Sequence, residues 1–395
     1  VLDLGIQPLA NNLLRPEHLA EPEPKFPLRV AVCSQCWLLQ ITDIVPPVTL
    51  FTDYLYFSSV SDALLAHAKN AAERYHREFH LGPSSLVVEV ASNDGYLLKN
   101  FVAASVPCLG IEPARNIAEV ASGRGIPTLN EFFGLATARQ VAAERGRADL
   151  ILGNNVLAHA PDTNDFVAGL AALVKPAGRI VLEFPYACDL IEHLEFDTIY
   201  HEHVFYFTLT ALLPLFERHG LSVFACERLP IHGGSLRIFA TPRGAHPIQS
   251  SIPALLAEEE AKGIPTHAYY ADFAKRVAGL KDTLLTLLRQ LRAEGHRLCA
   301  YGASAKGSTL LNYYGLGRDG FDCLDFVVDR SPAKQGRLTP GSHLPILSVE
   351  ELMSRRPRHA LLLTWNFADE ILRQQQAWRD AGGKFILPLP EVKIV

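Results

Sequence analysis

The stretch that decides the fold reads L-V-V-E-V-A-S-N-D-G-Y-L-L-K-N-F-V, residues 86–102. The apolar run 86–90 predicts a buried strand, the small and polar residues 91–95 predict a turn, and a helix is predicted from Tyr96. Glu89 near the strand's end suits a ligand that lies across its carboxyl end, where backbone amides and a helix N-terminus are exposed. With a single glycine, the turn differs from the G-x-G-x-x-G dinucleotide fingerprint.

The same order of strand, turn and helix continues downstream. The strand 108–111 ends in Glu112, 23 residues after Glu89, where a carboxylate can accept hydrogen bonds from both hydroxyls of a ribose. The next predicted elements are a strand at 149–155 that ends in Asn154 and Asn155, a helix at 166–174 and a strand at 178–184. Strands and helices that alternate through short loops predict an α/β fold with a doubly wound parallel sheet.

The last third of the chain contains a second, smaller unit of this kind. Before it come strands at 221–224 and 235–239, expected to form a terminal hairpin of the first sheet, a linker at 242–253 and a helical segment at 252–294. The second unit has strands at 297–301, 325–329 and 360–364, a turn at 302–307 and a helix from Ser308. Backbone amides of this turn can approach an anion, with Lys306 adding charge; alternatively, Lys306 is a solvated helix residue.

Length and composition exclude several classes of protein. At 395 residues the chain is predicted to divide into two or three domains. Its net charge of -5 argues against binding to nucleic acid, and no apolar run approaches the roughly 20 residues that span a bilayer, so we expect a cytoplasmic protein. Seven cysteines without a signal-peptide pattern indicate reduced thiols. The first residues resemble the middle of a domain, so we expect a natural segment upstream.

Two of the cysteines, Cys33 and Cys36, lie three positions apart on a predicted tight turn. This spacing is that of one half of a tetrahedral zinc site, which needs two more ligands. Either a partner pair precedes Val1 or these are two ordinary buried cysteines.

Residues 51–61, F-T-D-Y-L-Y-F-S-S-V-S, are rich in aromatic rings and hydroxyl groups and precede a helix predicted from Asp62. Ser61 fits the N-cap of that helix. The segment is either a packing loop or a cover over a ligand, in which case Tyr54 and Ser58 would close over it.

Residues 197–207, D-T-I-Y-H-E-H-V-F-Y-F, carry more polar groups than a buried segment needs for folding. Chemistry is therefore expected here, although a hydrogen-bonded structural corner and a metal site made by His201, Glu202 and His203 are alternatives. If the segment is extended, His201 faces away from His203 and is left out of the catalytic set.

Glu89, Glu112 and the stretch 154–159, in this order and spacing, resemble the class I S-adenosylmethionine-dependent methyltransferases. Together with C-S-Q-C, the Tyr54 segment, E-F-P-Y, Y-H-E-H-V-F-Y-F, G-G-S-L-R and G-A-S-A-K-G, they resemble the sugar C-methyltransferases that act on nucleotide-linked 4-keto-6-deoxy sugars. This resemblance covers essentially the whole chain. It implies an N-terminal zinc-binding domain at 1–80, the methyltransferase domain at 81–245 and a Rossmann-like domain at 246–395 that holds the nucleotide sugar. The family's zinc site uses four cysteines, and this chain departs from it in having only Cys33 and Cys36 of the four.

The resemblance also implies roles for single residues in transferring a methyl group from S-adenosylmethionine to the third ring carbon of a TDP- or GDP-linked sugar. By similarity, His203 is the base that removes the proton beside the ketone, and Glu202 orients it or raises its basicity. Tyr200 and His159 donate hydrogen bonds to the enolate oxygen, and Tyr54 shapes the side of the site that the segment 51–61 covers. The implied donor-binding residues are Glu89, Ala91, Asn93, Gly95, Glu112, Asn154, Asn155 and Ser58. The implied substrate-binding residues are Lys306, Ser304, Arg237 and Tyr54, and the implied metal ligands are Cys33 and Cys36.

Two other functions remain alternatives at the level of sequence. One is an O- or N-methyltransferase that acts on a different small metabolite, and the other is a nonenzymatic nucleotide-binding module. The identity of the nucleotide, the sugar and the oligomeric state stay open.

Overall fold

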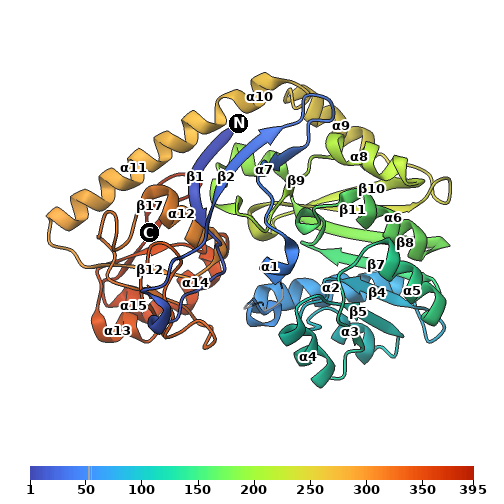
Figure 1. Cartoon of the computed structure of the whole chain (residues 1–395), viewed down its shortest axis with the longest axis horizontal. Coiled ribbons are helices and arrows are strands. Elements are labelled where there is room, and N and C mark those ends of the chain that lie inside the picture. The colour runs from blue at the N-terminus through green and yellow to red at the C-terminus, as the bar shows by residue number, and fades with distance from the viewer. Residues whose placement is uncertain (52–53, 55) are drawn as a thin grey trace.

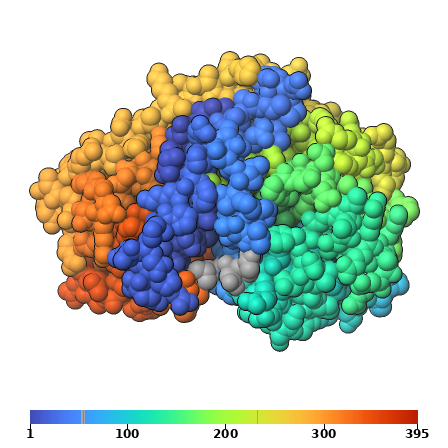
Figure 2. Space-filling view, in the orientation of Figure 1, coloured from blue at the N-terminus to red at the C-terminus, as the bar shows by residue number. Residues whose placement is uncertain are grey.

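Three β-sheets organise the protein, for which a computed structural model describes residues 1–51, 54 and 56–395, with the backbone but not the side chain of His232. Two α/β units lie side by side, and a small antiparallel sheet lies between them (Figure 1). Figure 2 shows the N-terminal residues, in blue, along the seam between the two larger units.

The small sheet combines three strands from the start of the chain with one strand from its middle. Its strand order is β1 (Leu2–Pro8), β2 (Lys25–Val32), β3 (Leu39–Ile41) and β9 (Phe205–Tyr206), all antiparallel. β9 comes from the polar segment 197–207, and Tyr206 pairs with Leu39. The expected catalytic segment is therefore built into the N-terminal sheet.

The middle unit is a seven-stranded sheet in the order β10-β11-β8-β7-β4-β5-β6. Its strands are β4 (Val87–Val90), β5 (Cys108–Ile111), β6 (Thr128–Leu129), β7 (Ala148–Asn154), β8 (Val174–Pro185), β10 (Leu221–Leu229) and β11 (Ser235–Pro242). The strands from β8 to β6 run parallel, whereas β11 is antiparallel to both β8 and β10. This confirms the predicted parallel sheet with its terminal hairpin.

Helices cover both faces of this sheet (Figure 1). They are α2 (Asp62–Glu78), α3 (Leu98–Ala103), α4 (Arg115–Gly123), α5 (Leu135–Arg145), α6 (Thr163–Leu173) and α8 (Leu209–Arg218), with the short α1 (Pro47–Phe51) and α7 (Ala187–Glu192) nearby. Ser61 is the N-cap of α2, as predicted, and accepts a hydrogen bond from the Leu64 amide. The helix after β4 begins at Leu98, two residues beyond the predicted Tyr96.

The C-terminal unit has a six-stranded sheet in the order β14-β13-β12-β15-β16-β17, parallel except for β17. Its strands are β12 (Leu298–Tyr301), β13 (Val327–Val328), β14 (Ile346–Leu347), β15 (His359–Leu362), β16 (Lys384–Leu387) and β17 (Lys393–Ile394). Its helices are α12 (Ala305–Tyr314), α13 (Glu351–Arg355), α14 (Ala368–Gln374) and α15 (Gln376–Asp380). The predicted smaller Rossmann-like unit is thus present.

The segment expected to be a linker is followed by three helices, α9 (Ser251–Ala261), α10 (His267–Ala271) and α11 (Phe273–Ala293). α9 packs on the middle unit, where the fully buried Glu259 accepts hydrogen bonds from Tyr186 and from the amides of Leu209 and Thr210 at the start of α8. α11 then runs along the top of the molecule toward the C-terminal unit (Figure 1).

Candidate active site

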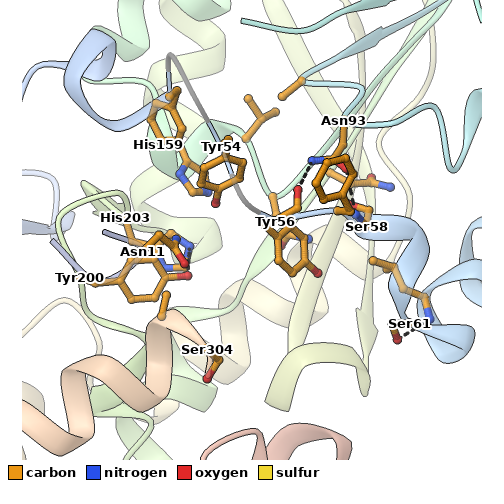
Figure 3. Close-up of a pocket in the computed structure, with 18 of the residues that line it drawn as sticks. Asn11, Tyr54, Tyr56, Ser58, Ser61, Asn93, His159, Tyr200, His203 and Ser304 are labelled. Carbon is orange, nitrogen blue, oxygen red and sulfur yellow. Dashed lines mark hydrogen bonds between the residues drawn. The ribbon is translucent and has the colours of Figure 1, made fainter. Parts of the chain in front are cut away.

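A cavity of about 730 Å³ opens between the two larger units. Side chains from all three sheets or their connections line it, and Figure 3 shows many of them. The wall includes Asn11, Tyr54, Asn93, His159, Tyr200, His203, Ser304 and Lys306.

The centre of the cavity wall is formed by His203 and Tyr200. His203 Nδ1 lies 2.8 Å from the carbonyl oxygen of Thr198, which can only accept, so Nδ1 carries the proton. Nε2 then has a lone pair and accepts a hydrogen bond from the Tyr200 hydroxyl at 2.9 Å. Burial raises the pKa of Tyr200 well above its ordinary value, with further contributions from Glu202 and other neighbours, so the phenol remains a donor. The pair thus offers a basic nitrogen beside a hydroxyl donor.

His159 lies against this pair, with its ring centroid 4.8 Å from that of His203. It follows β7 in a short 3-10 turn, Leu157–His159. Burial lowers the pKa of His159 to about 4, so the imidazole is neutral at ordinary pH and can donate one N–H group.

Tyr54 and Glu202 form a second polar pair beside the cavity. The Tyr54 hydroxyl donates to Glu202 Oε2 at 3.1 Å, and the Asn11 amide donates to both carboxylate oxygens. That Glu202 orients His203 or raises its basicity stays a prediction. The Thr198 carbonyl and the Tyr200 hydroxyl hold the imidazole, whereas the carboxylate binds side chains from the N-terminal half.

The loop after β4 and the end of β5 form one end of the cavity. Glu112 accepts a hydrogen bond from the backbone N–H of Asn93 at Oε2 and another from the backbone N–H of Ala114 at Oε1, both at 2.9 Å. Glu89 is fully buried, and neither of its carboxylate oxygens has a hydrogen-bond partner among the described residues. Burial raises the pKa of Glu89 well above its ordinary value, and the charges of Glu112 and Asp94 add to this effect.

The backbone conformation at this same end of the cavity is typical of a functional site. Ala91, Asn93 and Asn155 have φ values of 54°, 49° and 54°, a region that residues other than glycine seldom occupy. Such strain collects at functional sites, where surrounding structure maintains it. Gly95 has φ of 77°, and a Cβ there would lie 2.6 Å from the Ile126 side chain, so only glycine fits.

Part of the 51–61 segment crosses this end of the cavity as a strap, residues 54 and 56–61 of which are described. Asn93 accepts from the Ser58 amide at 2.9 Å and donates to the Tyr56 carbonyl at 3.0 Å (Figure 3). Asn116 forms the same two bonds with the backbone of Tyr54, at 3.1 and 2.8 Å. The strap is therefore tied to the loop after β4 and to the first turn of α4, which follows β5.

The opposite end of the cavity belongs to the C-terminal unit. Ser304 caps α12 by accepting from the Gly307 amide, and Lys306 lies in the helix's first turn with its ammonium 4.6 Å above the Trp365 ring. Asp329, at the end of β13, accepts a hydrogen bond from the Ala303 amide. Arg330 and Lys334 add two more cations to this part of the wall.

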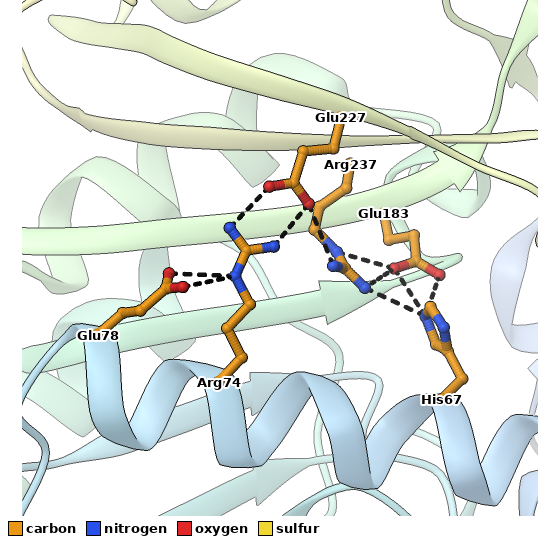
Figure 4. Close-up of polar contacts among 6 residues, drawn as sticks. All are labelled: His67, Arg74, Glu78, Glu183, Glu227 and Arg237. Carbon is orange, nitrogen blue, oxygen red and sulfur yellow. Dashed lines mark hydrogen bonds and ion pairs between the residues drawn. The ribbon is translucent and has the colours of Figure 1, made fainter.

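Arg237 does not line the cavity, contrary to the expectation that it would help to bind substrate. It lies on β11 with 6% of its side chain exposed and donates to Glu183 from Nε and Nη2 at 3.1 and 2.9 Å. Its other neighbours are Glu227 and His67, and Figure 4 shows that the network continues to Arg74 and Glu78 of α2. A buried guanidinium without these carboxylates would be costly, so its partners are structural.

Cys33 and Cys36 lie on the turn between β2 and β3, as predicted, and are free thiols. Among the residues that the structure describes, no cluster of three or more His, Cys, Asp or Glu side chains could hold a metal ion. Two thiols do not complete a tetrahedral zinc site, so the residues present do not fit a bound zinc ion.

Several site residues were not anticipated from sequence. Asn11, Asn116 and Asp329 each contact a predicted site segment, and in the first two cases the contact spans more than 60 positions along the chain. His201, expected to face away from His203, lies against Phe26 with its Nε2 3.1 Å from the Pro27 carbonyl.

Three protein-family models match successive parts of the chain: a zinc binding domain at residues 1–51, a methyltransferase domain at 64–225 and a C-methyltransferase C-terminal domain at 230–390. The C-methyltransferase NovU of Streptomyces niveus is 37% identical in an alignment of 396 residues that covers 100% of this chain and 94% of the relative.

Two solved structures with a likeness to the chain each match less than half of it. The magnesium protoporphyrin IX methyltransferase of Synechocystis with bound SAM is 14% identical, with a TM-score of 0.35, over 45% of this chain and 79% of that one. A SAM-dependent methyltransferase from Anabaena variabilis is 16% identical, with a TM-score of 0.35, over 44% and 84%. These likenesses are too distant to inform the reaction. No helix within residues 1–51, 54 and 56–395 is long and apolar enough to cross a membrane.

Proposed function

The chain belongs to the S-adenosylmethionine-dependent C-methyltransferases, the family of NovU, and we propose that it methylates the third ring carbon of a nucleotide-linked 4-keto-6-deoxy sugar. The observation that carries the proposal is the pair of His203 Nε2 and the Tyr200 hydroxyl, 2.9 Å apart on the cavity wall. A base and a donor at this separation suit a C–H bond and the ketone oxygen on neighbouring carbons.

The donor end of the cavity fits S-adenosylmethionine. The unpartnered oxygens of Glu89 suit a cationic ligand, and the remaining lone pairs of Glu112 suit the two ribose hydroxyls. Ala91, Asn93, Gly95, Asn154, Asn155 and Ser58 complete the proposed donor-binding set. When bound, this cofactor supplies an electrophilic methyl group on a positively charged sulfur.

His203 is the proposed base. The Thr198 carbonyl fixes the imidazole with its proton on Nδ1. When the ketone oxygen takes over the hydrogen bond of the Tyr200 hydroxyl, the lone pair of Nε2 is released to accept the proton from the third ring carbon. The electron pair of that C–H bond moves toward the neighbouring ketone, whose oxygen takes up the negative charge as an enolate. The carbon of this enolate would then form a bond to the methyl group that the bound donor supplies, the donor sulfur would keep the electron pair of the broken S–CH3 bond, and the C=O bond would be restored.

Tyr200 and His159 are the proposed donors to the enolate oxygen. The high pKa of the Tyr200 phenol and the low pKa of the His159 imidazole, both caused mainly by burial, keep each group neutral with a hydrogen to donate. Donors held in place before the charge develops typically contribute about 3 kcal/mol each to catalysis. Tyr54 closes the strap side of the same space.

Lys306 and Ser304 are the proposed contacts of the nucleotide diphosphate. They lie at the N-terminus of α12, where backbone amides favour an anion, and Arg330 and Lys334 on the same wall add positive charge. Both TDP and GDP satisfy this chemistry.

Solvent exchange tests the proposal. With TDP- or GDP-4-keto-6-deoxyglucose in D2O and without the methyl donor, the wild type should exchange the proton on the third carbon, and His203→Asn should lose that exchange. His201→Gln, which alters a buried histidine on the other side of the segment, should retain it. Turnover that gives an O- or N-methyl product without any exchange would instead support the acceptor alternative.

A further inference from the structure

Asn11 connects the N-terminal sheet to the active site. It follows β1 in a tight turn in which the Leu13 amide donates to its carbonyl at 2.9 Å, so its backbone position is fixed. The side chain is half-buried and lines the cavity beside Tyr54 (Figure 3). A residue of the N-terminal sheet thus forms part of the cavity wall.

The Asn11 amide is held by the Glu202 carboxylate. Its Nδ2 lies 2.8 Å from Oε1 and 2.7 Å from Oε2, and the only other hydrogen bond found to this carboxylate among the described residues comes from Tyr54, at 3.1 Å. Glu202 is 3% exposed and takes part in none of the ion pairs among those residues. Two neutral donors therefore hold a buried carboxylate that has no cation beside it.

We propose that Asn11 is a positioning residue that holds the Glu202 carboxylate, and through it the Tyr54 hydroxyl, in the arrangement required for methyl transfer. A buried carboxylate is costly unless its oxygens are hydrogen-bonded. Asn11 supplies the shorter contacts to both oxygens, so it favours the ionised form of Glu202, which accepts from Tyr54. The N-terminal sheet then contributes to catalysis as well as to folding.

The titratable groups around Glu202 support this reading. Tyr54 from the strap and Tyr200 from the same segment both interact with its charge, and His159, after β7, lies near its backbone. Burial raises the pKa of Glu202 to about 7, while the hydrogen bonds from Asn11 and Tyr54 lower it. Removal of Asn11 should therefore raise the pKa further and favour the neutral acid at pH 7.

Three variants separate this role from a general effect on folding. Asn11→Leu removes the donors at similar volume, and Asn11→Asp keeps the shape but places a second carboxyl group beside Glu202. Asn12→Leu is the matched control, because the neighbouring Asn12 is exposed and lies in the same turn.

Infrared difference titration of the enzyme without substrate gives the first measurement, with the protonated carboxyl band assigned by its absence from Glu202→Gln. Asn11→Leu should move this titration up by about one pH unit, and Asn11→Asp should move it further. Asn12→Leu should leave it unchanged. Because no sugar is present, this result does not depend on the proposed substrate.

The second measurement is the pH profile of kcat/KM for methyl transfer, which rests on the proposed function. The acid limb should shift upward in Asn11→Leu by the same amount, and the Asn11→Leu change should have no further effect in a Glu202→Gln background. An unshifted infrared titration in both Asn11 variants, or an equal shift in Asn12→Leu, would overturn the inference. Absence of methyl transfer to the sugar with a shifted infrared titration would count against the proposed substrate alone.

Discussion

Replacement of Arg237 by methionine decides between the two roles considered for this residue. The sequence suggested a contact with the substrate, whereas the structure pairs the guanidinium with Glu183 and Glu227. Arg237→Met keeps an unbranched aliphatic side chain at this position and removes the guanidinium with its charge. If the pairing is structural, the variant should lose stability in the middle sheet and keep its affinity for the sugar nucleotide.

The expected loss of stability in Arg237→Met follows from the contacts that Glu183 loses and keeps. Glu183, with 2% of its side chain exposed, would lose the two hydrogen bonds from Nε and Nη2 of Arg237 and keep His67. Removal of one partner from a buried ion pair typically costs about 3–5 kcal/mol, and the remaining His67 favours the lower figure, about 3 kcal/mol. This corresponds to opening of the local structure that is about 100-fold more frequent.

Hydrogen exchange of peptides from β8 and β11 is the suitable assay, because it reports on the middle sheet separately from the other units. Exchange in these peptides should be about 100-fold faster in Arg237→Met, and KM for the sugar nucleotide should stay within a factor of two. Arg74→Met, in the more exposed part of the same network, is the control and should change exchange much less. Unchanged exchange together with a tenfold rise in KM would refute the structural role.

The loss of stability in Arg237→Met should also depend on pH and become smaller as the pH falls. Burial alone would raise the pKa of Glu183, but His67 and Arg237 bring it below its ordinary value. In the wild type this carboxylate stabilises the fold above its unfolded pKa of about 4.3, and the contribution is lost as pH falls. In Arg237→Met the pKa of Glu183 should rise, so acid neutralises the unpaired charge and the difference from the wild type should shrink.

Three further variants test separate parts of the structure. Glu259→Gln should destabilise the protein by about 2–4 kcal/mol in urea unfolding, because one amide at the start of α8 loses its acceptor, while Glu258→Gln, at a half-buried neighbour in surface ion pairs, should cost less than about 1 kcal/mol. Glu112→Gln should weaken binding of S-adenosylmethionine by about 10- to 100-fold in calorimetry, since the amide cannot accept at both positions; unchanged affinity would contradict this. Lys306→Met should raise KM for the sugar nucleotide by at least about tenfold and leave donor affinity unchanged, and the opposite pattern would contradict the assignment of the two ends.

The strands could be predicted from sequence because each is a short apolar run that is buried on both faces of a parallel sheet. Val87, Val88, Leu150 and Ile151 are all completely buried, and their runs end at turn residues. The acids Glu89 and Glu112 were found for the same reason, since each stands out at or near the end of such a run.

The contacts that complete the site could not be predicted, because each joins residues far apart in sequence. Asn11 and Glu202 are separated by 191 positions, and β9 pairs with β3 although the two strands lie far apart in the sequence. For Arg237 the resemblance implied a contact with the substrate, and only the folded structure shows that Glu183 lies opposite it on β8.

In both α/β units, a carboxylate after one strand accepts a hydrogen bond from the loop after the neighbouring strand, at the end of the cavity. Glu112, after the second strand of the middle unit, accepts from the Asn93 amide in the loop after the first strand. Asp329, after β13, accepts in the same way from the Ala303 amide after β12. Each carboxylate fixes a ligand-facing loop and keeps lone pairs for hydroxyl groups, so geometry alone does not say which ligand binds at which end.

Charge makes that distinction. The middle unit gathers acidic groups at its end of the cavity, where Glu112 lines the wall and Glu89 and Asp94 lie nearby; burial raises the pKa of Glu89, and the charges of Glu112 and Asp94 raise it further. The C-terminal end presents Lys306, Arg330 and Lys334, of which Arg330 pairs with Glu370 and Lys334 with Asp329. The proposed assignment therefore puts the sulfonium cation at the first end, near Glu112, and the diphosphate at the second, near Lys306. The sugar of a nucleotide proposed to bind in this direction would then face His203 on the cavity wall.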